Sequence, residues 1–177
     1  MKFSLFSLAL LVLSAYTIDA VQWRIADDYA VRFSGSGAKG TFGNLRGTLR
    51  FDANDLPASR MDVRVDVATI DTGNATKDKH ARSADWFDAE QYPHIRFTSQ
   101  SFTKTSAGYR VRGTLNLHGT DRRVEFPFTF EETATGGVFV GSFVVNRDDY
   151  GLTGPWLRGN LVGSEFEIDL RVPVLPL

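Results

Sequence analysis

The sequence of 177 residues contains no cysteine. Without thiols, the chain can form no disulfide, no thiolate metal site and no cysteine nucleophile. It also lacks an excess of basic charge, because 20 Lys and Arg residues are balanced by 21 Asp and Glu residues. Nucleic-acid binding needs clustered cations that neutralise phosphates. We therefore expect no nucleic-acid partner.

Long apolar runs are missing as well. The run near the N-terminus, Leu8–Leu13, is much shorter than the roughly 20 residues that cross a bilayer as a helix. It lies between a positively charged start and a stretch of small and polar residues, the order found in secretory signal peptides. The sequence predicts a signal peptide over 1–20, cleaved after Ala15 or Ala20, and a mature periplasmic domain over 21–177. An uncleaved tether is the alternative.

Phenylalanine is abundant, with 14 copies. Its ring adds apolar area without a polar group, so the chain must hold either an aromatic core or an apolar cavity. Most apolar residues alternate with polar ones, as in RMDVRVDVATID at 60–71 and RVEFPFTFEE at 123–132. A period of two predicts strands with one buried and one solvated face, which indicates an antiparallel sheet.

Turn-forming segments separate these alternating runs. The runs predict about eight strands, at 21–35, 41–53, 60–71, 94–104, 108–118, 122–132, 137–147 and 160–173. An all-β chain of this kind closes into a barrel or a sandwich. Pro127 lies inside one run and cannot donate to a ladder, so that strand should be an edge or bulged there. The only helix expected is short and lies in the segment 76–92, which polar residues at 71–74 precede as a cap.

The segment 76–92, called the lid segment below, concentrates charged and aromatic residues. One reading is catalytic: Asp78, His80, Asp85 and Asp88 would serve a hydrolase or lyase. The other is structural: Trp86 and Phe87 must bury their rings, and an open end of the barrel is the nearest apolar surface. We favour the structural reading, because no nucleophile motif surrounds these residues.

Two further groups bear on chemistry. The three histidines, His80, His94 and His118, have no spacing that fixes two of them on one face, so we expect no metal and no cofactor. Arg147, in the dense motif NRDDYG at 146–151, suits a buried pair with a carboxylate such as Asp149 or Asp71. Its alternative role is contact with the polar head of a ligand.

At this point the motifs resemble those of the YceI-like family. The resemblance rests on IDTG at 70–73, KDKHARSADWFD at 77–88, YP at 92–93, GTLNLHG at 113–119 and NRDDYG at 146–151. It implies an exported, lipocalin-like antiparallel barrel that binds a polyisoprenoid lipid or an isoprenoid quinone. Relatives often carry a His-Ser pair, and later a second His, where this sequence has Asp28 with Tyr29 and a Gly-rich run at 34–40. This departure implies a different contact with the ligand's head group.

An eight-stranded barrel is either filled by side chains or hollow enough for one ligand, and the resemblance favours the hollow form. The side chains expected to line it are Phe42, Leu49, Phe51, Val63, Val65, Val67, Trp86, Phe87, Phe97, Leu115, Leu117, Phe126, Phe128, Val145 and Phe166. The sequence thus predicts a non-catalytic protein that sequesters or transports an apolar lipid. Transient membrane contact and a monomer or homodimer are compatible with this role.

Overall fold

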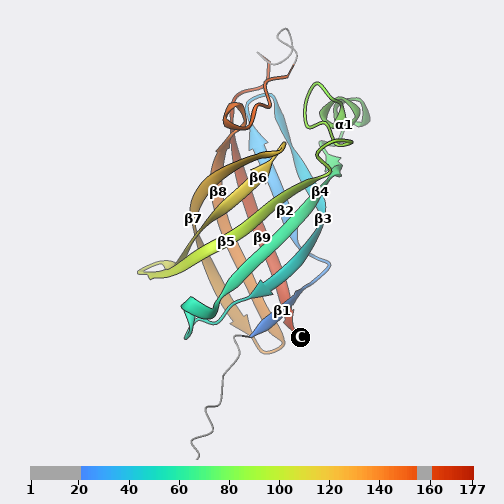
Figure 1. Cartoon of the computed structure of the whole chain (residues 1–177). Helices are drawn as coiled ribbons and strands as arrows, with labels where there is room; N and C mark the ends of the chain where they lie inside the picture. The colour runs from blue at the N-terminus through green and yellow to red at the C-terminus, as the bar shows by residue number, and fades with distance from the viewer. Residues whose placement is uncertain (1–20, 155–160) are drawn as a thin grey trace, which may run out of the picture.

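The computed structural model describes residues 21–154 and 161–177. They form one antiparallel sheet that closes on itself (Figure 1). The strands are β1 Gln22–Ile25, β2 Ala30–Gly35, β3 Ala38–Arg50, β4 Arg60–Asp71, β5 His94–Thr105, β6 Gly108–Leu117, β7 Thr120–Thr133, β8 Gly136–Asn146 and β9 Glu165–Pro176. The helical elements are η1 Leu56–Ala58, α1 Ala75–Arg82 and η2 Arg147–Tyr150. The predicted signal peptide, 1–20, lies outside the described residues.

The sheet is an eight-stranded barrel whose first strand is interrupted. Strands β2 to β9 follow each other around the barrel, and β3 pairs with both β2 and β4. The short β1 pairs with the same two neighbours as β2, namely β3 and β9, but nearer the other end of the barrel. The predicted strand 21–35 therefore consists of two shorter strands, β1 and β2, that share one place in the strand order. The predicted barrel is confirmed.

Proline 127 lies where the sequence expected a defect. It faces Arg110 of β6, but the pairing of β7 with β8 starts only one residue later, at Phe128 with Gly141. Pro127 has no amide proton to offer a ladder, and it is the first position of β7 that has no partner in β8. The expected edge or bulge is thus a local loss of pairing with β8, while β7 as a whole lies between β6 and β8.

The lid segment connects β4 to β5 at one end of the barrel (Figure 1). Its helix starts as expected, because the Asn74 side chain accepts hydrogen bonds from the amides of Thr76 and Lys77. It is short, as expected, and ends at Arg82. The Ser83 backbone is extended and its hydroxyl donates to the His80 carbonyl at 2.7 Å, so the rest of the segment forms turns.

Candidate functional site: an apolar cavity in the barrel

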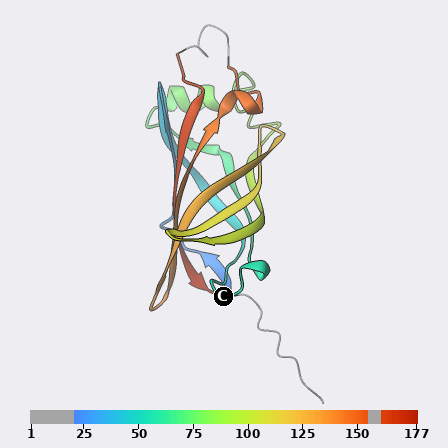
Figure 2. The ribbon, with the colours of Figure 1, turned by 90° about the vertical axis from the view of Figure 1, so that its left-hand side faces the viewer.

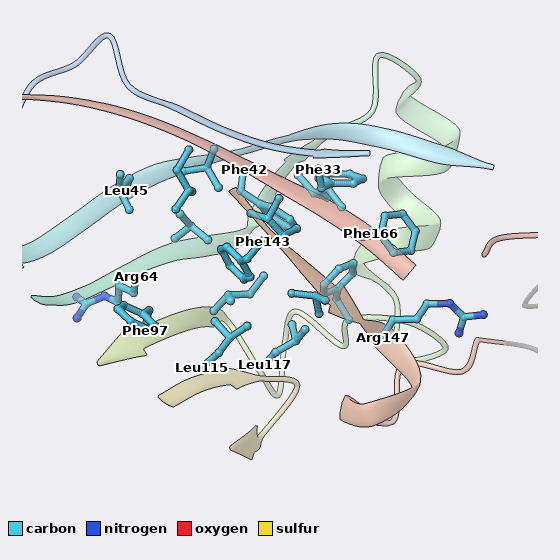
Figure 3. Close-up of a pocket in the computed structure, with 18 of the residues that line it drawn as sticks. Phe33, Phe42, Leu45, Arg64, Phe97, Leu115, Leu117, Phe143, Arg147 and Phe166 are labelled. Carbon is cyan, nitrogen blue, oxygen red and sulfur yellow. The ribbon is translucent and has the colours of Figure 1, made fainter. Parts of the chain in front are cut away.

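The barrel encloses a cavity of about 590 Å³, within the range of about 300–1,000 Å³ typical of small-molecule sites. Alternate residues of every long strand project into it, which is why the alternating pattern of the sequence produces it. In Figure 3, Phe33, Phe42, Phe143 and Phe166 converge on this space from different strands. None of the described residues that line it is an aspartate or a glutamate.

Most of the residues predicted to line the barrel border this cavity. They are Phe42, Leu49, Val63, Val65, Trp86, Phe87, Phe97, Leu115, Leu117, Phe126, Phe128, Val145 and Phe166. They come from seven strands and the lid segment, so the fold brings distant parts of the sequence to one surface.

Two predicted lining residues, Phe51 and Val67, lie elsewhere. Phe51 follows the end of β3 and is only 1% exposed, inside an aromatic cluster at the end of the barrel opposite α1. Val67 is equally buried but does not border the cavity, and its amide donates to the Pro93 carbonyl at 2.9 Å. For Val67 the cause is a bulge: Thr41 and Gly43 are two positions apart, while their β4 partners Asp71 and Asp66 are five apart. The extra residues shift the alternation, so that Ile70 faces the cavity instead.

Sequence reasoning missed several lining residues. The apolar ones with a clear alternating signal are Val31, Phe33, Phe143, Ile168 and Leu170. They stand at every second position of β2, β8 and β9, so the period of two could have found them. His80 and Lys77 also border the cavity, at its α1 end, and no pattern distinguishes them from other surface residues of a helix.

The aromatic pair of the lid segment covers the α1 end of the cavity. The Phe87 ring meets Phe42 edge-on, with 5.6 Å between ring centroids. Trp86 packs against Gly154, where an added Cβ would lie 2.6 Å from the indole ring. Gly154 also has a positive φ of 65°. Any residue with a side chain would therefore be strained there, both by the contact with Trp86 and by the backbone conformation.

Arg147 ties this end together from the other side. Its guanidinium donates to the carbonyl groups of Gly163 and Val162, each at 3.0 Å, and to that of Leu152. It also pairs with Asp148 at 3.0 Å, not with Asp149 or Asp71 as the sequence suggested. The side chain is only 11% exposed and lies over the Trp86 ring at 5.5 Å. The geometry therefore shows a clasp between segments, and contact with a ligand stays a prediction.

Two of the carboxylates proposed for catalysis, Asp78 and Asp88, have structural partners. Asp78 accepts hydrogen bonds from the amide and the hydroxyl of Thr72, at 2.8 and 2.6 Å, and these bonds hold the pKa of Asp78 below its usual range. The His80 carbonyl accepts from Ser83, and the Asp88 side chain faces the Gln91 amide. These bonds stabilise the turns of the lid segment.

Within residues 21–154 and 161–177, no three His, Asp or Glu side chains gather in an arrangement that could hold a metal ion. Among the same residues, no helix has the length and apolar character needed to cross a membrane.

Comparison with known proteins places this barrel in a family. The YceI-like domain matches residues 16–174, nearly the whole sequence. The chain belongs to the YceI-like family. A UPF0312 protein of Pseudomonas savastanoi pv. phaseolicola is 33% identical over 148 residues, which cover 79% of this chain and 77% of the relative. The UPF0312 protein plu2095 of Photorhabdus laumondii is 38% identical over 85 residues, which cover 48% of this chain but only 44% of that relative.

A solved structure has the same YceI-like architecture. It is a polyisoprenoid binding domain from Saccharophagus degradans implicated in plant cell wall breakdown, and it superposes with a TM-score of 0.68. The match covers 89% of this chain and 99% of that domain, at 16% identity. At this identity the comparison establishes the fold, which agrees with the strand order described above.

Where YceI-like relatives are expected to carry histidine and serine, this barrel uses Asp28 and Tyr29. The Tyr29 hydroxyl accepts a hydrogen bond from the Leu45 amide at 3.0 Å and so ties the break between β1 and β2 to β3. Asp28 is exposed and lies 3.8 Å from Arg171 on the outside of the barrel. Neither residue borders the cavity. At these two positions the difference from the relatives therefore alters the barrel wall and not the lining of the cavity.

Proposed function

We propose that the protein is a non-catalytic, extracytoplasmic binding protein for a long apolar lipid, a polyisoprenoid or an isoprenoid quinone, which it sequesters or transports. The observation that carries the proposal is the cavity of about 590 Å³, which is lined mainly by Phe, Leu, Ile and Val. The polyisoprenoid binding domain from Saccharophagus degradans, which shares the fold, supports the ligand class. The signal-peptide pattern of residues 1–20 supports export.

The energetics favour a chain-like ligand over a compact polar one. Each buried CH₂ contributes about 0.8 kcal/mol, so a five-carbon isoprene unit gains roughly 3–4 kcal/mol on leaving water. A membrane offers the same gain, so burial alone cannot draw a lipid out of a bilayer. The protein must therefore compete through the shape of its cavity, or exchange the lipid between membranes.

The cavity also supports the proposal that the protein is non-catalytic. Its lining contains no carboxylate among the described residues, and Asp78, which the enzymatic alternative requires, is engaged by Thr72. A carboxylate with a lowered pKa is a weak base and is deprotonated at neutral pH, so it is poorly suited to general acid or base work. Binding requires no reactive group.

The test combines identification of the ligand with a variant that fills the cavity. Protein purified from cells is analysed by native mass spectrometry and organic extraction, and a co-purifying apolar lipid is expected. Leu115→Trp places a large ring in the cavity and should abolish lipid recovery. Val144→Trp, on the outside of β8 where the side chain is 62% exposed, is the matched control and should retain the lipid.

Both variants should fold, which thermal unfolding checks. Equal lipid content in a folded Leu115→Trp variant and in the control would contradict binding in the barrel. Repeated isolation of empty protein, together with no binding of added prenyl alcohols or quinones, would contradict the proposal as a whole.

A further inference from the structure

The barrel wall has one long interruption in its hydrogen-bonded ladder, between β7 and β8. The two strands share six paired positions, from Phe128 with Gly141 to Thr133 with Gly136. Beyond these, no residue of Thr120–Pro127 is paired with any residue of Ser142–Asn146. Figure 2 shows the two strands running together near their hairpin and diverging toward η2. We call this unpaired stretch the β7–β8 seam.

The strands on either side of the seam are firmly held by their other neighbours. β8 has ten paired positions with β9, which extend to Asn146. β7 has nine with β6, which extend to Thr120. The seam is therefore a boundary between two intact ladders, and separating them breaks no backbone pairing.

Apolar side chains fill the seam from the inside. Phe126 of β7 and Phe143 of β8 stack with 4.6 Å between ring centroids and an interplanar angle of 17°. Both rings border the cavity, as do Gly141 and the outward-facing Val140 at the paired end of the seam. The cavity thus reaches the barrel wall at the point where the backbone ladder is absent.

Both ends of the seam are fixed. At one end lies the paired part of β7 and β8, which begins next to Pro127. At the other, the Arg122 side chain of β7 donates to the Asp149 carbonyl of η2 at 3.0 Å. A slit bounded at both ends can widen in its middle while the barrel stays closed.

The α1 end of the barrel is a weaker candidate for a route into the cavity. Trp86 and Phe87 cover it, and Arg147 bonds the carbonyl groups of three residues around it. Opening there would break several charge-assisted hydrogen bonds, whereas opening the seam separates two stacked rings and their apolar neighbours.

We propose that the β7–β8 seam is the lateral portal through which an apolar chain enters and leaves the cavity, with Phe126 and Phe143 as its gate. This inference rests on the proposed function. A lateral slit suits a long chain, because the chain can pass sideways through the wall and need not be threaded end-first past the lid segment.

The test locks the seam with a covalent bridge. Because the chain has no cysteine, two introduced cysteines are its only thiols. Continuing the register of Phe128 and Gly141 places Glu125 opposite Val144 on the outer surface, so E125C/V144C joined by a short bis-maleimide spans the seam. V144C/E167C, a directly paired position of β8 and β9, joined by the same reagent, is the control.

The measurement is the rate at which NBD-labelled farnesol passes between the protein and phosphatidylcholine vesicles. The bridge across the seam should slow both uptake and release by about tenfold or more, as expected for a blocked gate, while the equilibrium affinity stays unchanged. The control bridge should leave the rates unchanged. In the unbridged protein, Phe126→Leu with Phe143→Leu should accelerate release about threefold or more, since the stacked rings are lost.

Unchanged exchange in the bridged seam variant, with normal binding at equilibrium, would overturn the portal and leave the proposed function standing. No binding of the probe at equilibrium by the unmodified protein would overturn both. If the lid segment is the route instead, the seam bridge has no effect while Arg147→Met accelerates exchange.

Discussion

The two ends of the barrel are built from the same kinds of residue but differ in how well they are filled. At the end opposite α1, five rings surround Phe51, with centroid distances of 5.0 to 5.9 Å: Phe102, Tyr109, Phe128, Phe130 and Phe139. Trp23 closes this end and donates from its indole to the Phe51 carbonyl at 2.9 Å. Toward α1, the inward side chains leave the cavity of about 590 Å³.

The difference teaches how one barrel combines stability with a binding space. Phe51 meets its neighbours mostly edge-on, and such aromatic pairs add about 0.5–1.5 kcal/mol each beyond the area that they bury. The cavity end gains less from packing, because side chains that border a void have no partner atoms on one side. We therefore expect stability to depend on the Phe51 end and binding on the cavity end.

The largest effect expected is on the filled end. Phe51→Ala should lower the free energy of unfolding by about 3–5 kcal/mol, because it removes the central ring of a densely packed cluster. Urea denaturation followed by tryptophan fluorescence measures the loss. If Phe51→Ala lowers the free energy of unfolding less than the substitution of a cavity-lining residue does, the expected difference between the two ends is contradicted.

The clasp at the cavity end should come next. Arg147→Met keeps the packed stem but leaves buried carbonyl groups without a donor, which costs about 1–3 kcal/mol. Arg122→Met, which removes one exposed hydrogen bond, is the control and should cost less. Equal losses in the two variants would show that Arg147 does not clasp this end.

Replacement of a residue that borders the cavity should lower the free energy of unfolding less, and weaken ligand binding more, than replacement of Phe51. Phe166 is partly exposed to the cavity and touches Phe33 edge-on at 6.1 Å. Phe166→Ala should lower the free energy of unfolding by about 1 kcal/mol, since fewer contacts are lost, and should weaken binding of a prenyl probe measurably. Calorimetry gives the first value and fluorescence titration the second.

The smallest effect expected is that of acid on the lid segment. The hydrogen bonds from Thr72 lower the pKa of Asp78 in the folded protein. A group of this kind contributes stability that is complete above the ordinary carboxyl range near about 4 and is lost as the pH falls through the lowered value. Melting temperature should therefore fall below this range, and less steeply in Asp78→Asn. Glu125 and Asp62 share the trend, since arginine side chains lower the pKa of both.

The strands were predictable because a half-buried sheet enforces a period of two. The observed β4 and the predicted strand at 60–71 have the same bounds, and the remaining strands differ by a few residues. The period also located most of the cavity lining. It failed at Val67, where extra residues in β4 reverse the alternation, and at Phe51, which turns inward after its strand has ended.

Other features depend on contacts that no local pattern encodes. Pro127 indicated a defect in β7, but which neighbour was lost depended on the path of β8, a separate strand that begins only at Gly136. Arg147 was correctly suspected of a structural pairing, yet its partners are mainly backbone carbonyl groups, which every residue carries. A sequence cannot mark such acceptors.

The interrupted first strand has a consequence for how the barrel is completed. β1 lies between β3 and the last residues of β9, with Trp23 opposite Pro176. The two ends of the described chain therefore close the end of the barrel that holds the aromatic cluster. Contacts so distant in sequence form late and slowly. A nascent chain that still lacks residues 174–176 therefore cannot complete this end of the barrel. Removal of β1 or of residues 174–176 should leave this end of the barrel open to solvent.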